Sequence, residues 1–446
     1  MPRSFLGISA EYWTVPIWGR EARRLSRVFA MLSPDGPVRL RIGGDSADRV
    51  LWSPTKELPE WVFELTPSWL RQTSQIVRET GTKLILDLNT MSSTPKLAAR
   101  WARTAIAGLP AGSIRAFEVG NEPDIYNQGA WRHMTAGPGA PPLPSHITAA
   151  GYASSFASYA RAVARVAHGV PLLAPALAEP QKNADWISQL LAAPHPYLAG
   201  ITAHRYPYSA CARTSAPTYP TIARVLSEEA TAGMGRTAVN LEHISDPAKM
   251  PLWLTEINSV TCGGIKGVSD TFATALWAPD ALFELIRSGT EAAFVHVRPP
   301  LSNMAFSLTR QGLQARPLLY GMVLFAKTIG AGAELVPVRV LASTSFHFKA
   351  WAVRVNGGVM RVLLLNKGAR DMRVRVRLAR GRVALVQRLR APNVTSTSGV
   401  TFGHQYLTGL ATWAGRARTQ RVARSSKGFL ISVPRYSAAL MTVHLQ

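Results

Sequence analysis

The sequence predicts an α/β protein in which residues 1–330 form a (β/α)8 barrel of the TIM type and residues 331–446 form an antiparallel β-sandwich. Short apolar runs alternate with segments of helical periodicity as far as about residue 328, a pattern typical of parallel strands joined by helices. From about Glu334 the chain changes to short alternating strands separated by Gly/Asn turns, as in an antiparallel domain. A chain of 446 residues has room for a barrel of roughly 250 to 330 residues and a smaller second domain.

Eight strands are expected in the barrel. They cover 5–12, 38–42, 83–89, a run from 117, 171–177, 200–204, a run from 251, and 292–297. Helices begin at Thr66-Pro67 and Thr94-Pro95, where threonine precedes proline, and Gly81 is expected to end the first of them. Others cover 149–167, the region around Trp186, and 317–328. The Gly/Pro-rich stretch 137–144 is too long for a simple connector, and we expect it to overhang the barrel mouth.

Glu122 is the first candidate for chemistry. It follows the apolar run that begins at Phe117, which places it at the carboxyl end of a buried strand, where barrel enzymes carry their active sites. Gly120 permits a sharp turn, and Pro123 disfavours a right-handed helical conformation at Glu122. The carboxylate is therefore expected to leave the sheet in a fixed direction.

Glu256 follows a second apolar strand, in the stretch PLWLTEINS at 251–259, and the pair Gly263-Gly264 comes soon after it. The two glutamates are 134 residues apart, enough for about three β/α units. We therefore expect them to face each other across one barrel mouth.

The motifs around both glutamates resemble those of retaining glycosidases with (β/α)8 barrels, and NEPD together with TEINSVTCGG resembles glycoside hydrolase family 79, the β-glucuronidase and heparanase family. The resemblance implies that Glu122 is the acid/base and Glu256 the nucleophile. It implies that Asn121 binds the sugar 2-OH and that Tyr206 holds Glu256, although a core tyrosine is the alternative. The expected activity is exo-acting removal of terminal β-D-glucuronic acid by a two-step double displacement, without metal or cofactor.

Further candidates lie at other strand ends. The resemblance assigns the substrate carboxylate to backbone N–H groups of 259–264, which include Gly263 and Gly264, where this chain has Thr261 and Cys262 in place of an aromatic hydroxyl. The remaining polar candidates for sugar binding are Asp45, Asn89, His204, Asn258 and His296. A helix cap is the alternative role for Asp45, and a structural strand histidine is the alternative for His296.

The net charge is +24 and the sequence pI is about 10.8, which favours acidic partners or reflects genome composition. We expect no nucleic-acid partner, because no run of five Lys/Arg and no zinc-finger or RNP signature occurs. No apolar run reaches the ~18 residues that a transmembrane helix needs. The arginines that alternate with apolar residues in 372–383 indicate a solvated sheet face or an anion-binding one.

Only two cysteines occur, Cys211 and Cys262, and they are predicted either to form a disulfide between neighbouring loops or to remain free. A disulfide would indicate an oxidising compartment. The start MPRSFLGIS lacks a signal peptide's apolar region, so the protein is cytoplasmic or is secreted or periplasmic with a leader outside this sequence.

Two other functions stay open at this stage. One is an endo-acting hydrolase of heparan-like acidic polysaccharide, which the basic charge favours. The other is a non-catalytic protein that binds carbohydrate or polyanions, against which both strand-end glutamates argue. The sequence makes no prediction of the oligomeric state.

Overall fold

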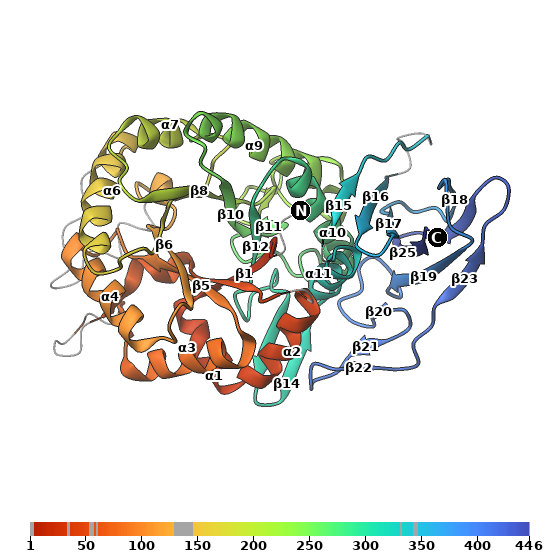
Figure 1. Cartoon of the computed structure of the whole chain (residues 1–446), viewed down its shortest axis with the longest axis horizontal. Helices are drawn as coiled ribbons and strands as arrows, with labels where there is room; N and C mark the ends of the chain where they lie inside the picture. Colours follow the sequence, from red (N-terminus) through yellow and green to blue (C-terminus); the bar gives the residue numbers. More distant parts are fainter. Residues whose placement is uncertain are drawn as a thin grey trace.

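The computed structural model describes residues 4–33, 36–52, 58, 61–128, 146–330, 332–341 and 347–445. Figure 1 shows two parts side by side, a barrel with an outer layer of helices and a β-domain formed by the last quarter of the chain. The predicted loop 137–144 lies outside the described residues.

Eight parallel strands close into a barrel in the order β1-β12-β10-β8-β7-β6-β5-β2, which confirms the predicted fold. The neighbours pair in parallel register, for example Ile8 with Leu40 across β1 and β2. The strands are β1 (Leu6–Glu11), β2 (Arg39–Gly43), β5 (Lys83–Leu88), β6 (Ile114–Val119), β7 (Leu172–Leu177), β8 (Leu198–Arg205), β10 (Leu252–Ile257) and β12 (Ala292–His296).

A helix follows each barrel strand. Thr66 caps α3 by accepting from the Trp69 N–H, Pro67 is its first residue, and Gly81 ends it with φ +67°, as the sequence predicts. The principal helices are α2 (Ala22–Leu32), α3 (Pro67–Thr80), α4 (Pro95–Gly108), α6 (Ala149–Ala164), α7 (Asp185–Ala192), α9 (Glu229–Ser245), α10 (Phe272–Arg287) and α11 (Pro317–Thr328). Shorter ones are α1 (Val15–Arg20) and α8 (Ile222–Val225). Among the described residues, no helix is long and apolar enough to cross a membrane.

Loops between barrel elements carry short strands that the sequence analysis did not predict. The pairs are β3 (Val50–Trp52) with β4 (Phe63–Leu65), β9 (Tyr208–Ser209) with β11 (Val260–Thr261), and β13 (Phe306–Thr309) with β14 (Gly312–Ala315). Directly after β9 and β11, Cys211 and Cys262 form a disulfide, which decides between the two alternatives for these cysteines.

The β-domain begins at β15, six residues after α11 ends at Thr328. Its main sheet runs β15-β16-β17-β25-β19-β20, with β23 also paired to β19, while β18 and β24 form a separate antiparallel ribbon. The strands are β15 (Glu334–Val336), β16 (Phe348–Val355), β17 (Val359–Asn366), β18 (Met372–Val376), β19 (Val383–Arg390), β20 (Thr401–Phe402), β21 (Tyr406–Leu407), β22 (Trp413–Ala414), β23 (Gln420–Ala423), β24 (Phe429–Val433) and β25 (Ser437–His444).

Each face of the main sheet has its own apolar contacts. Val362 and Met441 pack with Phe429 and Ile431 of the ribbon, which makes the domain a two-layer sandwich. Leu363 and other residues of the opposite face belong to the core that includes α10 and α11. Successive side chains of β17 point to opposite faces of the sheet, so one set packs against the ribbon and the other against the barrel helices. The ribbon, the sheet and the barrel therefore form successive packed layers.

Charged side chains also cross the contact between barrel and β-domain. Asp280 of α10 is fully buried, and its carboxylate accepts from Lys367 Nζ at 2.7 Å and from the indole N–H of Trp351 at 2.9 Å. Lys349 Nζ lies 3.0 Å from the Glu284 carboxylate. A buried ion pair is costly to break, so these contacts couple the two parts of the molecule during unfolding.

Candidate active site

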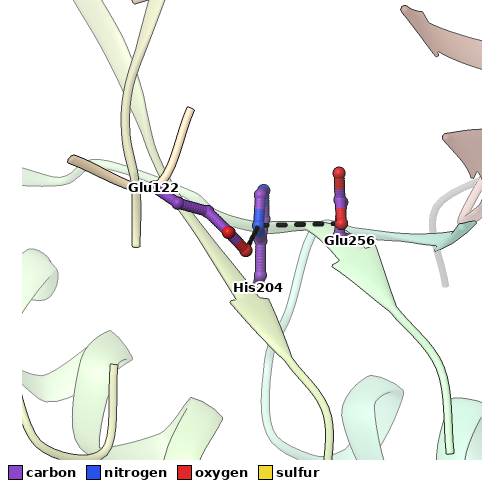
Figure 2. A group of neighbouring side chains, drawn as sticks. All are labelled: Glu122, His204 and Glu256. Atoms are coloured by element: carbon purple, nitrogen blue, oxygen red, sulfur yellow. Dashed lines mark hydrogen bonds and ion pairs between the residues drawn. The ribbon is translucent and has the colours of Figure 1, made fainter. Parts of the chain in front are cut away.

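The two glutamates meet at the carboxyl end of the barrel, as the sequence predicts. Glu256 lies within β10, and Glu122 follows β6, where it takes a left-handed conformation with φ 53° immediately before Pro123. The Glu122 N–H donates to the carbonyl of Ala176 at 3.0 Å, which holds this turn against β7. Figure 2 shows His204 between the two carboxylates. One imidazole nitrogen of His204 and one carboxylate oxygen of each glutamate lie within 4.8 Å of one another.

Glu256 is held by three neighbours, two in the strands β2 and β12 and one, Tyr206, directly after β8. The Tyr206 hydroxyl donates to its Oε2 at 2.8 Å, and Arg41 Nη1 donates to its Oε1 at 2.6 Å. His296 Nδ1 lies 3.4 Å from Oε1. The carboxylate is therefore fixed in direction from both of its oxygens, and Tyr206 occupies the position expected for it.

Arg41 is the centre of a buried ion network that the sequence analysis missed. The side chain is fully buried, and it makes a hydrogen bond with each of its five N–H positions. The acceptors are Ser9 (3.2 Å), Asp87 (2.8 Å), Glu118 (2.5 Å), Asn121 (3.0 Å) and Glu256 (2.6 Å). Arg41 therefore joins Glu256 of the mouth to two carboxylates inside the barrel, Asp87 and Glu118.

The environments of the two glutamates shift their acidity in opposite directions. Burial, and then the negative charge of Glu256, raise the pKa of Glu122 well above its ordinary value. Burial alone would raise the pKa of Glu256 as well, but His296, His204, Arg41 and the Tyr206 hydrogen bond together lower it. These environments favour the protonated form of Glu122 and the ionised form of Glu256, the combination that acid/base work beside a nucleophile requires.

His204 bridges the pair as a neutral imidazole. Burial lowers the pKa of His204 to about 4, so at neutral pH the Arg41 guanidinium, rather than His204, is the cation that stabilises the ionised Glu256. His204 Nδ1 lies 2.8 Å from Glu122 Oε1 and 3.8 Å from Glu256 Oε2. Its Nε2 is buried without a hydrogen-bond partner among the described residues.

A second group of charges borders the mouth on the side of β1 and β12. Arg298 donates to Asp45 at 2.5 Å and lies 3.5 Å from Glu11, which in turn lies 3.6 Å from His296 Nε2. Asp45 lies in the first turn of the 3-10 helix Gly44–Arg49, whose N-cap residue is Gly43, and the Asp45 carboxylate faces Arg298. Asp45 and His296 therefore belong to the border of the site, and Glu11 and Arg298 are members that the sequence analysis did not select.

Two predicted sugar ligands are engaged in loop structure. The Asn89 amide donates to Val50 O and Ser92 Oγ and accepts from the Ser92 N–H. The Asn258 amide donates to the carbonyls of His296 and Asn303 and accepts from the Ser259 N–H. Both amides thus hold turns at strand ends, and their hydrogen bonds go to residues other than Glu122 and Glu256. Their expected binding of sugar hydroxyls stays a prediction.

Gly263 and Gly264 follow β11 with φ near +76° each. A Cβ on Gly264 would lie 2.6 Å from Ser269 Oγ and 2.9 Å from Asn303, so close packing as well as backbone conformation requires glycine there. The N–H of Ser259 is already occupied by Asn258, and the N–H of Gly264 donates to Thr261 O at 3.2 Å. Binding of a substrate carboxylate by this loop stays a prediction.

The three donor atoms of Glu122, His204 and Glu256 are close enough to hold a metal ion. Two observations favour proton transfer instead. Both oxygens of Glu256 already accept hydrogen bonds, and the Arg41 guanidinium beside them would repel a second cation. What the arrangement can do is protonate a leaving group from one side and stabilise or attack a cationic carbon from the other.

Comparison with known proteins places the fold but not the family. No protein-family model and no curated protein matches the sequence. Among solved structures, a 4-O-α-L-rhamnosyl-β-D-glucuronidase from Fusarium oxysporum is similar with a TM-score of 0.79 and 16% identity, over 99% of this chain and 96% of that chain. A GH51 arabinofuranosidase from Xanthomonas axonopodis has a TM-score of 0.66 and 16% identity, over 94% and 89%.

A third neighbour is a GH30 endoxylanase from Clostridium papyrosolvens, with a TM-score of 0.58 and 13% identity over 100% of this chain and 97% of that chain. All three are glycosidases by their descriptions. At these identities the likeness shows a shared barrel with a β-domain, the architecture of this group of glycoside hydrolases.

Proposed function

We propose that the protein is a retaining glycoside hydrolase of the family 79 type, which removes terminal β-D-glucuronic acid from the end of its substrate. The observation that carries this proposal is the pair Glu122 and Glu256, with carboxylate oxygens within 4.8 Å of each other and pKa values shifted in opposite directions. Inverting enzymes keep their carboxyl groups about 6.5–9.5 Å apart to admit a water, whereas retaining enzymes keep them about 5–5.5 Å apart.

The reaction proceeds in two steps. Glu122 gives its proton to the glycosidic oxygen as that bond breaks, and the Glu256 carboxylate forms an ester with the anomeric carbon. The ionised Glu122 then takes a proton from a water whose oxygen attacks the same carbon, and the ester bond to Glu256 breaks. Both protein groups return to their starting states, and two displacements at one carbon retain its configuration.

The other side chains of the mouth have supporting roles. Arg41 donates to Asn121 Oδ1 at 3.0 Å, which orients this buried amide, and the Asn121 side chain also interacts with the Asp48 carboxylate. This amide is the group for the sugar 2-OH, an interaction that strengthens in the transition state. Tyr206 stabilises the ionised Glu256 in the free enzyme and gives up part of this bond as the ester forms.

The preference for glucuronate has separate support. The Fusarium enzyme with the similar fold is described as a glucuronidase. Arg298 and His296 place cationic groups at the border of the mouth, and the charge of Glu256 raises the pKa of His296 after burial has lowered it. The alternative of endo-acting cleavage of acidic polysaccharide is favoured by the net charge of +24.

A substrate panel tests the assignment. Purified enzyme is given aryl β-glucuronide, aryl β-glucoside, aryl β-xyloside and heparan sulfate, and the products are separated by chain length. Release of glucuronic acid from the first substrate alone supports the exo assignment, while shortened heparan chains without aryl glucuronide cleavage support the endo alternative.

Glu256→Gln is the matching variant, and Glu64→Gln, an exposed glutamate on β4, is its control. We expect the first to abolish turnover and the second to leave it unchanged. Equal turnover by Glu256→Gln and wild type on every active substrate would overturn the enzyme proposal.

We also propose an oxidising location, secreted or periplasmic, on the basis of the Cys211–Cys262 disulfide. Mass spectrometry of alkylated protein from the native host tests this, since free thiols at both positions would favour a cytoplasmic location.

A further inference from the structure

The basic charge of the protein is concentrated in the β-domain. Residues 331–446 contain 19 lysine and arginine residues against two acidic residues, a net charge of +17 out of +24 for the whole chain. The barrel, almost three times longer, therefore carries only a small part of the excess. Genome composition alone acts on the whole chain, so this asymmetry calls for a local explanation.

The ribbon of β18 and β24 displays part of this charge on its outer face. Val374 and Val376 pack toward the sandwich core, so alternation turns Arg373 and Arg375 outward, and Arg377 continues the same phase. All three are exposed. Alternate strand residues are about 7 Å apart, so the three guanidinium groups form a row along one edge of the molecule. We call Arg373, Arg375 and Arg377 the arginine row.

No acidic side chain among the described residues lies within ion-pair distance of the arginine row. Of the two acids in the β-domain, Glu334 pairs with Arg354, and Asp371 accepts from the backbone N–H of Arg435. A row of like charges without counter-charges repels itself, and a bound polyanion relieves that repulsion.

One further cation extends the surface beyond the row. Arg388 of β19 donates to Ser432 O of β24 at 3.0 and 3.1 Å, which anchors a fourth guanidinium against the ribbon. Figure 1 shows β18 and β23 at the end of the molecule that points away from the barrel, so this surface is separate from the mouth.

We propose that the arginine row is a docking surface for acidic polysaccharide, which holds the enzyme on a polymeric substrate. Single-stranded nucleic acid fits less well, because the outward residues of the ribbon include no aromatic side chain on which a base stacks; they are Arg373, Arg375, Leu430 and Ser432. The choice of polysaccharide rests on the proposed function, since a glycosidase that cleaves acidic sugars meets such chains. Docking raises the local concentration of chain ends near the mouth.

The test compares two triple variants of the full chain. Arg373→Gln/Arg375→Gln/Arg377→Gln removes the row. Its control removes the same number of charges from exposed positions on barrel helices that have no ion pair among the described residues, Arg71→Gln/Arg78→Gln/Arg103→Gln. The dissociation constants for immobilised heparan sulfate, polygalacturonate, neutral dextran and duplex DNA are measured from 50 to 300 mM NaCl.

We expect wild type to bind both acidic polysaccharides but not dextran. Loss of the row weakens this binding by about tenfold at low salt and lowers the slope of log K against log salt by about 2, the effect of three lost ionic contacts. The control variant binds as wild type. Both variants should melt as wild type and cleave the aryl glycoside as wild type does, because neither touches the mouth.

Equal weakening in both variants would overturn the proposal, since the effect would then come from net charge alone. Tighter wild-type binding to duplex DNA than to either acidic polysaccharide at the same salt would also overturn it. Failure of the proposed function is seen separately, as absence of aryl glycoside cleavage in a protein whose polysaccharide binding still depends on the row.

Discussion

Replacement of Arg41 by methionine tests the ion network beneath the active site. The substitution keeps an apolar stem of similar length but removes all five hydrogen bonds of a fully buried guanidinium. Asp87, Glu118 and Glu256 then share one buried region without their common cation. Breaking a buried ion pair by removing one partner costs about 3–5 kcal/mol, because the remaining charge is left uncompensated.

This cost translates into a melting temperature. An entropy of unfolding of about 2.1 cal/mol/K per residue gives about 0.9 kcal/mol/K for a chain of 446 residues. If barrel and β-domain unfold together, as their buried ion pairs indicate, Arg41→Met should lower the melting temperature by about 3–5 °C at pH 7.5. Arg71→Met, at an exposed position on α3, should change the free energy of unfolding by less than about 0.5 kcal/mol.

The loss should also depend on pH, with a definite sign. Burial raises the pKa of Asp87 in the wild-type protein, and the Arg41 charge opposes that rise. Without Arg41 the folded-state pKa rises further above the unfolded value, so the folded variant binds a proton that the unfolded chain does not. Its stability therefore increases as pH falls from 7.5 to 5. Calorimetry that finds Arg41→Met within about 1 °C of wild type at both pH values would refute this reasoning.

Three further changes probe the site and its surroundings. Glu122→Gln should lower kcat/KM on substrates with poor leaving groups by about 10²–10⁴-fold. It should also remove the alkaline limb of the pH–rate profile, because wild type loses activity as pH rises through the raised pKa of Glu122. Persistence of that limb in the variant would assign it to another group. Tyr206→Phe should move the acidic limb to higher pH by about one to two pH units, because a hydrogen bond to a charged group contributes about 1.5–3 kcal/mol and this one favours ionised Glu256. An unmoved limb would show that the bond does not stabilise ionised Glu256. Cys262→Ser removes the disulfide to Cys211, 51 residues away, and should lower the free energy of unfolding by about 4 kcal/mol in the chain-entropy model. Equal denaturation midpoints for the variant and wild type would contradict this prediction.

Local signals predicted the elements and the two glutamates well. Helix α3 begins and ends where Thr66, Pro67 and Gly81 indicate, because capping depends on neighbours in sequence. Glu122 and Glu256 were found because each lies at the carboxyl end of a mostly apolar strand. The parallel closure of the barrel then brings all such strand ends to one rim, whatever their separation along the chain.

The ion network was missed because its members lie inside strands rather than at their ends. Arg41, Asp87 and Glu118 each interrupt an apolar strand, and a charge in a strand buried on both faces needs a partner of opposite sign. That signal was present in the sequence. Which of these charges meet across the barrel depends on the register of neighbouring strands, which residue patterns do not specify.

Asn89 and Asn258 show the opposite case, in which residues were selected from their positions in sequence but their side chains bind groups of the surrounding loops. Their positions at strand ends are those of sugar ligands, but their amides satisfy backbone groups of the turns in which they lie. An asparagine has the same appearance in sequence whether it faces a ligand or its own loop. The loop conformation decides the matter, and it depends on long-range contacts such as that between Asn258 and Asn303.

The stereochemistry of cleavage tests the central claim most directly. Wild-type enzyme and an aryl β-glucuronide are followed by proton NMR in deuterated buffer during the first minutes, before the released sugar mutarotates. Glu122 and Glu256 at their observed separation predict that β-glucuronic acid appears first and that the α-anomer grows in later. An α-anomer as the first product would mean inversion, and it would contradict the assignment of Glu256 as a nucleophile.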